Sequence, residues 1–194
     1  MNRRLTILIF AAAFLLTACG GIPLRAIPRL LQFSSDMLEA NPAEFRVALQ
    51  VDARISPPAS TVPMLKIQLT PKTLGAFEPV DKSLPLQLAT TSGAVIGLDP
   101  APRGRRWLYY SLPPETQAEL RGIQATVRRA QAQPGYQKGG QLSLGIEQTD
   151  LALTDPALAN TRWETWLQTK QSEGFFMVWT GTPAQILRQA KAAR

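Results

Sequence analysis

Short runs of alternating apolar and polar residues, separated by prolines, limit the fold more than any other feature of this sequence. The chain has 194 residues and 16 prolines, most of which fall between the runs. Alternation with a period of two is typical of a β-strand with one buried face. Because proline cannot donate a hydrogen bond to a strand ladder, the prolines mark places where strands end. The pattern predicts an α+β fold built on an antiparallel sheet or sandwich of about 6–8 short strands.

The first half of the chain contains four such runs. Residues 44–54 and 65–70 alternate clearly, and the proline-rich loop between them suggests an antiparallel pair. Residues 84–88 form a third run, and Pro85 inside it indicates an edge strand whose Leu84, Leu86 and Leu88 share one face. Residues 95–98 are a candidate for a short fourth strand.

Aromatic and aliphatic residues dominate residues 107–112, which predicts another strand. In a strand, Leu108, Tyr110 and Leu112 would face one side, and Trp107 and Tyr109 would face the other. Further along the chain, we expect a strand at about residues 141–148.

Two helices are expected. The longer one covers about residues 114–132, with acidic residues near its start, basic residues near its end, and a buried stripe of Leu120, Ile123 and Val127. A short C-terminal helix follows Thr182-Pro183-Ala184-Gln185, which has the form of a capping box with proline at the first helical position.

Residues 161–169 and 174–180 are expected to form a hairpin around residues 170–174. This region is rich in aromatic side chains, namely Trp163, Trp166, Phe175, Phe176 and Trp179. Such side chains either fill the core, which is the commoner role, or line an apolar ligand pocket.

Most of the common catalytic groups are missing from the sequence. There is no histidine and only one cysteine, which excludes a histidine base, a histidine metal ligand, a cysteine-rich zinc site and an intrachain disulfide. The nucleophile motifs Gly-x-Ser-x-Gly and Ser-x-x-Lys are absent, and so is a glycine-rich phosphate loop. We therefore expect a protein that is not an enzyme and that holds neither a metal nor another cofactor.

Glu147, Asp150 and Asp155 form the densest acidic group of the C-terminal half. We interpret them as solvated turn residues, since charged side chains are rarely buried. A carboxylate-dependent hydrolase cleft and a Ca²⁺ site are the alternatives.

The strongest candidate interaction patch consists of three arginines and the adjacent aromatic residues, Arg103, Arg105, Arg106, Trp107 and Tyr109. Guanidinium groups bind phosphate or carboxylate in a bidentate manner, and aromatic rings stack on sugars or lie at membrane interfaces. The patch therefore suits an anionic partner, which would be a phospholipid head, a glycan or an acidic protein. The alternative is a basic loop followed by a core strand.

The N-terminus has the form of a secretion signal. Arg3 and Arg4 precede an uncharged stretch over residues 5–18. This stretch is shorter than the ~20 residues of a membrane-spanning helix. It has the length of a secretory h-region, and it leads into Leu16-Thr17-Ala18-Cys19.

That ending resembles the lipobox of bacterial lipoproteins. The resemblance implies cleavage between Ala18 and Cys19, with a diacylglyceryl group on the Cys19 thiol and often a further acyl chain on the new amine. Two or three acyl chains hold a protein stably on a membrane. Gly20 stands where an aspartate would retain the protein at the inner membrane, which favours the outer membrane. The resemblance covers only about the first twenty residues.

Tyr109-Tyr110-Ser111-Leu112-Pro113 is similar to a run found in small lipoproteins that assist ABC transporters. In those proteins the run lies soon after the lipidated cysteine, whereas here it lies about ninety residues later. That function is therefore not carried over to this chain.

These observations divide the chain into a lipoprotein signal peptide (1–18), a lipid-anchored tether with a short helix (19–43) and a single periplasmic α+β domain (44–194). We expect a membrane-anchored, non-enzymatic binding or assembly component of the bacterial cell envelope. A carrier of a hydrophobic ligand such as a lipid, and a carboxylate-dependent hydrolase, are the alternatives. Cleavage before Cys19 removes two arginines and no acidic residue, which leaves 19 basic and 14 acidic residues and a formal charge of +5. This modest basic excess suits an anionic membrane surface, or is unselected charge that keeps the chain soluble, which is the commoner explanation. Secretion separates the chain from nucleic acid.

Replacement of Cys19 by alanine is expected to abolish lipid attachment, because the thiol is the acceptor, and to leave an unprocessed precursor. Incorporation of labelled palmitate and the size of the chain on a gel measure the two effects. Undiminished labelling of Cys19→Ala would contradict the anchor.

Overall fold

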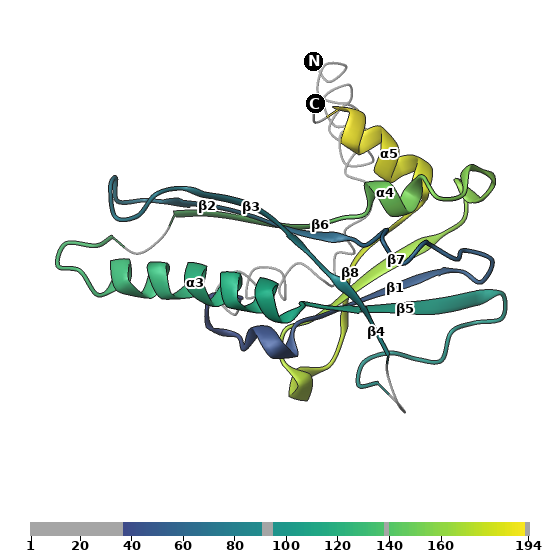
Figure 1. Cartoon of the computed structure of the whole chain (residues 1–194), viewed down its shortest axis with the longest axis horizontal. Coiled ribbons are helices and arrows are strands. Elements are labelled where there is room, and N and C mark those ends of the chain that lie inside the picture. Colours follow the sequence, from purple (N-terminus) through teal and green to yellow (C-terminus); the bar gives the residue numbers. More distant parts are fainter. Residues whose placement is uncertain (1–36, 91–94, 138–139, 193–194) are drawn as a thin grey trace, which may run out of the picture.

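A computed structural model describes residues 37–90, 95–137 and 140–192, and within them the chain has an α+β fold with two antiparallel sheets (Figure 1). The signal peptide, Cys19 and most of the expected tether helix lie outside the described residues. None of the helices in the described ranges is long and apolar enough to cross a membrane.

The first sheet has five strands in the order β4-β5-β1-β7-β8. Their bounds are Gln87–Ala89 for β4, Arg105–Ser111 for β5, Arg46–Asp52 for β1, Trp163–Gln168 for β7 and Phe176–Gly181 for β8. β1 is the central strand, and both of its faces are buried, including Ala48 and Gln50. The expectation of one buried face for this run was therefore wrong.

The second sheet has three strands in the order β3-β2-β6. They span Val80–Pro85, Met64–Pro71 and Gly140–Glu147, respectively. The expected pairing of residues 44–54 with residues 65–70 was wrong, because β1 and β2 belong to different sheets. β1 needs a partner on each side and finds them in β5 and β7, while β2 keeps one polar face toward solvent.

The run at residues 84–88 divides at Leu86 into two edge strands. β3 lies at an edge of the three-stranded sheet and β4 at an edge of the five-stranded sheet, so the edge position indicated by Pro85 is confirmed. Leu84 and Leu86 are buried, but Leu88 is 59% exposed, so the three leucines do not share a buried face.

Residues 95–98 form a turn, and the expected strand there is absent. The Leu98 N–H donates to the Val95 carbonyl over 3.2 Å. Gly97 has a φ of 85°, and a Cβ at this position would collide with the backbone of Phe175. This close approach requires glycine and prevents an extended strand.

The long helix is confirmed as α3, over Pro114–Gln131. Its stripe of Leu120, Ile123 and Val127 is buried in the core. Figure 1 shows α3 running along the β2-β3-β6 sheet. An ion pair of 3.0 Å between Lys82 on β3 and Glu119 on α3 links the two elements at their margin.

The C-terminal half follows the expected order. β7 and β8 form an antiparallel hairpin, and α5 spans Pro183–Ala192. Its capping box is confirmed, since the Thr182 N–H donates to Gln185 Oε1 over 2.8 Å and the Gln185 N–H donates to Thr182 Oγ1 over 3.3 Å. A four-residue helix that the sequence pattern does not show, α4 (Thr149–Ala152), packs beside α5 (Figure 1).

The side chain of Gln124 fastens the chain before β1 to α3. Residues 37–39 are helical, and Met37 is 2% exposed. The Gln124 amide is buried and donates to the carbonyls of Met37 and Ala40 over 2.8 and 2.9 Å. The two carbonyls lie at the C-terminal end of the short helical segment, where no further turn supplies a donor, and the Gln124 amide satisfies them instead.

Gln124→Leu is expected to lower the free energy of unfolding by about 2 kcal/mol, because it leaves two buried carbonyls without a donor. Urea unfolding followed by circular dichroism measures the change. Gln131→Leu, at an exposed position of the same helix, serves as the control. Equal stability of the two variants would contradict the assigned role of Gln124.

Candidate functional site

The outer face of the five-stranded sheet collects three aromatic side chains, which we call the aromatic face: Trp107, Tyr109 and Trp166. Trp107 and Tyr109 come from β5, where they lie opposite Gln50 and Ala48 of β1. Trp166 comes from β7 and lies opposite Ala48 from the other side. The aromatic face therefore spans three adjacent strands.

The rings of the aromatic face are packed and hydrogen-bonded while remaining partly exposed. The centroid of Trp107 lies 6.0 Å from that of Trp166, edge to face, and 6.3 Å from that of Tyr109. Trp107 Nε1 donates to the Asp99 carbonyl over 3.0 Å, and Trp166 Nε1 donates to Glu164 Oε2 over 3.2 Å. Rings fixed in this way offer apolar area that is already ordered.

The structure divides the arginine and aromatic patch expected from the sequence. Arg105 lies on the same face of β5 as Trp107 and Tyr109. Arg106 lies on the opposite face, and Arg103 lies in the exposed turn before the strand. The alternation predicted for Trp107 and Tyr109 against Leu108 and Tyr110 is confirmed, since the latter two are buried.

The guanidinium of Arg105 is engaged within the protein. Its Nη2 donates to the Gln50 carbonyl over 2.8 Å. Burial lowers the pKa of Arg105, and the neighbouring carboxylates of Glu164 and Asp52 oppose that shift. Glu164 also forms an ion pair of 3.0 Å with Arg162. The charges around the aromatic face are thus of both signs.

A pocket of about 450 Å³, which we call the α5 pocket, lies where the two sheets and α5 meet. Its apolar lining includes Leu144 and Ile146 from β6, Val178 and Trp179 from β8, and Ile186 and Ala190 from α5. A register shift in the β7–β8 ladder occurs between Thr165 and Trp166. Bulges of this kind redirect side chains, and here both Val178 and Trp179 contribute to the lining.

The polar residues that line the α5 pocket lie around the end of β6, on β7 and on α5, and they are Lys66, Glu147, Gln148, Thr149, Thr165 and Gln189. Lys66 Nζ and Glu147 Oε2 form an ion pair of 2.9 Å whose side chains are partly exposed. Gln148 is buried and donates through Nε2 to Thr165 Oγ1 over 2.8 Å. Its other amide atom, Oε1, is buried without a hydrogen-bond partner in the described part of the chain.

The aromatic residues of the C-terminal hairpin have three different positions. Trp163 and Phe175 are buried in the core, and Phe176 packs against it. Trp179 lines the α5 pocket, and Trp166 belongs to the aromatic face. Trp166 was missed as a partner of Trp107, because only the pairing of both strands with β1 brings them together.

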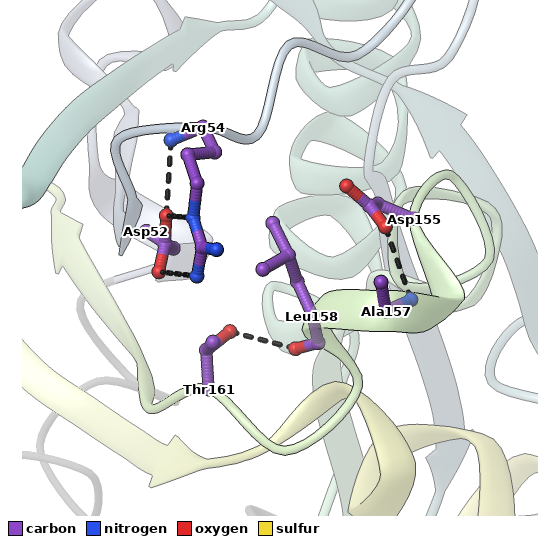
Figure 2. A network of polar contacts seen from close by, with 6 residues as sticks. All are labelled: Asp52, Arg54, Asp155, Ala157, Leu158 and Thr161. Atoms are coloured by element: carbon purple, nitrogen blue, oxygen red, sulfur yellow. Dashed lines mark hydrogen bonds and ion pairs between the residues drawn. The ribbon is translucent and has the colours of Figure 1, made fainter.

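The acidic residues have local partners. Asp52 accepts from Arg54 through the backbone N–H and two guanidinium nitrogens over 2.9–3.0 Å (Figure 2). Asp155 accepts from the Ala157 N–H over 3.0 Å, which agrees with a turn residue, and Glu147 pairs with Lys66. Among the described residues, no group of three or more histidine, cysteine or acidic side chains is placed to hold a metal ion.

The fold and these surfaces define a class: an α+β protein with two antiparallel sheets, a partly exposed aromatic face and an apolar pocket. No protein-family model matches the chain, and neither the curated proteins nor the solved structures that were searched contain a match.

The bonds from Arg54 hold the pKa of Asp52 at about 2, below its ordinary value of 3.8. Because this pKa is depressed, the ionised carboxylate stabilises the fold above about pH 3.8, and that stabilisation is lost as the pH falls toward 2. Arg54→Gln is expected to raise the pKa of Asp52 toward 3.8, as measured by NMR titration of its carboxyl carbon. Arg162→Gln is the control and leaves the pKa of Asp52 low. An unchanged titration in Arg54→Gln would contradict this cause.

Proposed function

We propose that this protein is a lipid-anchored, periplasm-facing component of the bacterial cell envelope that binds another envelope protein without catalysing a reaction. The observation that supports the proposal is the aromatic face, in which three ordered and partly exposed rings lie on a sheet. Tryptophan and tyrosine are enriched at the centres of protein interfaces. Their low conformational freedom here reduces the entropy lost on binding.

The charges near the aromatic face favour a protein partner over an anionic membrane surface. Arg105 is bonded to the Gln50 carbonyl, and Arg162 is paired with Glu164. A mixed pattern of charge selects a partner with a complementary pattern, whereas an anionic bilayer attracts an excess of unpaired basic groups. Arg106 is exposed on the opposite side of β5 from the rings, and Arg103 is exposed in the turn before that strand.

The proposed anchor is compatible with this role. Eighteen positions separate Cys19 from Met37, the first described residue. A chain of that length reaches at most about 65 Å when fully extended. The domain therefore remains near the membrane surface, within reach of other envelope proteins.

Carriage of a hydrophobic ligand is the second candidate function. The α5 pocket favours it, because a cavity with an apolar lining and few polar groups is the common form of a small-molecule site.

Photo-crosslinking in intact cells tests the proposed interface. With p-benzoylphenylalanine in place of Tyr109, ultraviolet light is expected to link the protein to one envelope protein, because the aromatic face lies in the contact. The matched control has the same residue in place of Thr70, an exposed position of β2 on the other sheet. Immunoblotting and mass spectrometry measure the yield and identify the adduct.

Equal adducts from both positions, or none from position 109, would contradict the interface. Adducts with lipid alone would move the partner from protein to membrane, which also rejects the proposal as stated.

A further inference from the structure

We infer that the α5 pocket binds one acyl chain of a zwitterionic phospholipid, with the headgroup beside Lys66 and Glu147. This site is separate from the aromatic face. Thr165 and Leu167 line the pocket, and Trp166 between them on β7 belongs to the aromatic face. Alternation along a strand places neighbouring side chains on opposite faces, so the two surfaces lie on opposite sides of β7.

The packing of α5 is the first reason. The helix is amphipathic, yet Pro183 alone is buried among its residues. Ile186 and Leu187 are only partly buried against the core, and Ala190 is also partly exposed at the pocket. An apolar side that faces a cavity loses the contacts that a filled core would supply. An acyl chain in the pocket would complete the packing of this helix.

The size and lining of the pocket limit what can occupy it. A volume of about 450 Å³ lies within the range of about 300–1,000 Å³ that is usual for ligand sites. Ordered water needs two to four polar partners, which the apolar part of the lining, formed by residues such as Leu144, Ile146 and Ile186, does not provide. A flexible hydrocarbon chain needs none, so it suits the part of the pocket formed by β6, β8 and α5.

The polar end of the pocket indicates the headgroup. Lys66 and Glu147 place a positive and a negative charge 2.9 Å apart, and both side chains are accessible. A headgroup with a phosphate and an ammonium complements this pair, whereas a purely anionic headgroup is repelled by Glu147. The amide oxygen of Gln148, which lines the pocket, lacks a donor among the described residues, and an ammonium N–H of the headgroup would supply one.

Trp179 provides an internal probe for the acyl chain. The test uses the full chain in cholate, whose rigid steroid body differs from an acyl chain, and lysophosphatidylethanolamine with a brominated acyl chain as the quencher. We expect saturable quenching of tryptophan fluorescence. Trp179→Phe is expected to lose most of this quenching, and Trp107→Phe, on the aromatic face, is expected to retain it.

Ala190 allows the pocket to be filled from α5. It lines the pocket one helical turn after Ile186, and it is only partly buried. Ala190→Leu is expected to weaken binding roughly tenfold or more by occupying the space of the ligand. Ala192→Leu is the matched control, because Ala192 is an exposed residue of the same helix and does not line the pocket. Thermal unfolding of each variant confirms that it is folded.

Three results would overturn the inference. They are quenching that does not saturate, quenching that persists in Trp179→Phe, and wild-type affinity in folded Ala190→Leu. Equal affinity for the anionic lysophosphatidylglycerol would overturn the zwitterionic headgroup. The crosslinking at position 109 does not depend on any of these results, so the failure of one proposal is distinguishable from the failure of the other.

Discussion

The central strand β1 is hydrogen-bonded on both sides and covered on both faces, and the rest of the structure is arranged around it. Its inner side chains belong to the core. Its outer Ala48 and Gln50 are buried because Trp107 and Trp166, from the strands on either side, meet above them. The aromatic face is therefore also a cover for the centre of the sheet. A partner that binds there uses side chains that the fold already holds in place, which explains how large rings stay ordered while partly exposed.

β7 lies between the two candidate surfaces and contributes side chains to both. One side chain of this strand, Trp166, contributes to the aromatic face, and its neighbours Thr165 and Leu167 contribute to the α5 pocket. The register shift at Thr165 and Trp166 lies at this boundary. A displacement of β7 caused by an acyl chain would also be felt by the rings on the other side, because packed interiors transmit strain.

The sequence allowed accurate prediction of features that depend on near neighbours along the chain. The faces of β5, the span of α3, the β7–β8 hairpin and the capping box of Thr182 all follow from local periodicity or local hydrogen bonds. The partners of β1 and β2 did not, because alternation shows that a strand has a buried face but not which strand lies beside it. The predictions for Leu88 and for residues 95–98 were wrong for a similar reason. The chain changes sheet before Leu88, and Gly97 closely approaches Phe175, and neither feature depends on near neighbours along the chain. The α5 pocket needs both sheets, and a single aromatic residue, Trp179, was its only sequence signal.

The two surfaces differ in how they would discriminate between ligands. Apolar area gives affinity without direction, so specificity depends on the few polar groups at its edge. At the aromatic face, Arg105 Nη2 is bonded to the Gln50 carbonyl and Glu164 to Trp166, whereas Arg105 Nε is buried without a hydrogen-bond partner among the described residues. With most polar groups engaged in this way, selection there would come mainly from shape and from the overall pattern of charge. In the α5 pocket, Gln148 keeps an unused acceptor, and Lys66 with Glu147 is accessible. The polar groups of the pocket would therefore distinguish ligands by the chemistry of their headgroups. The aromatic face would distinguish macromolecules by their shape.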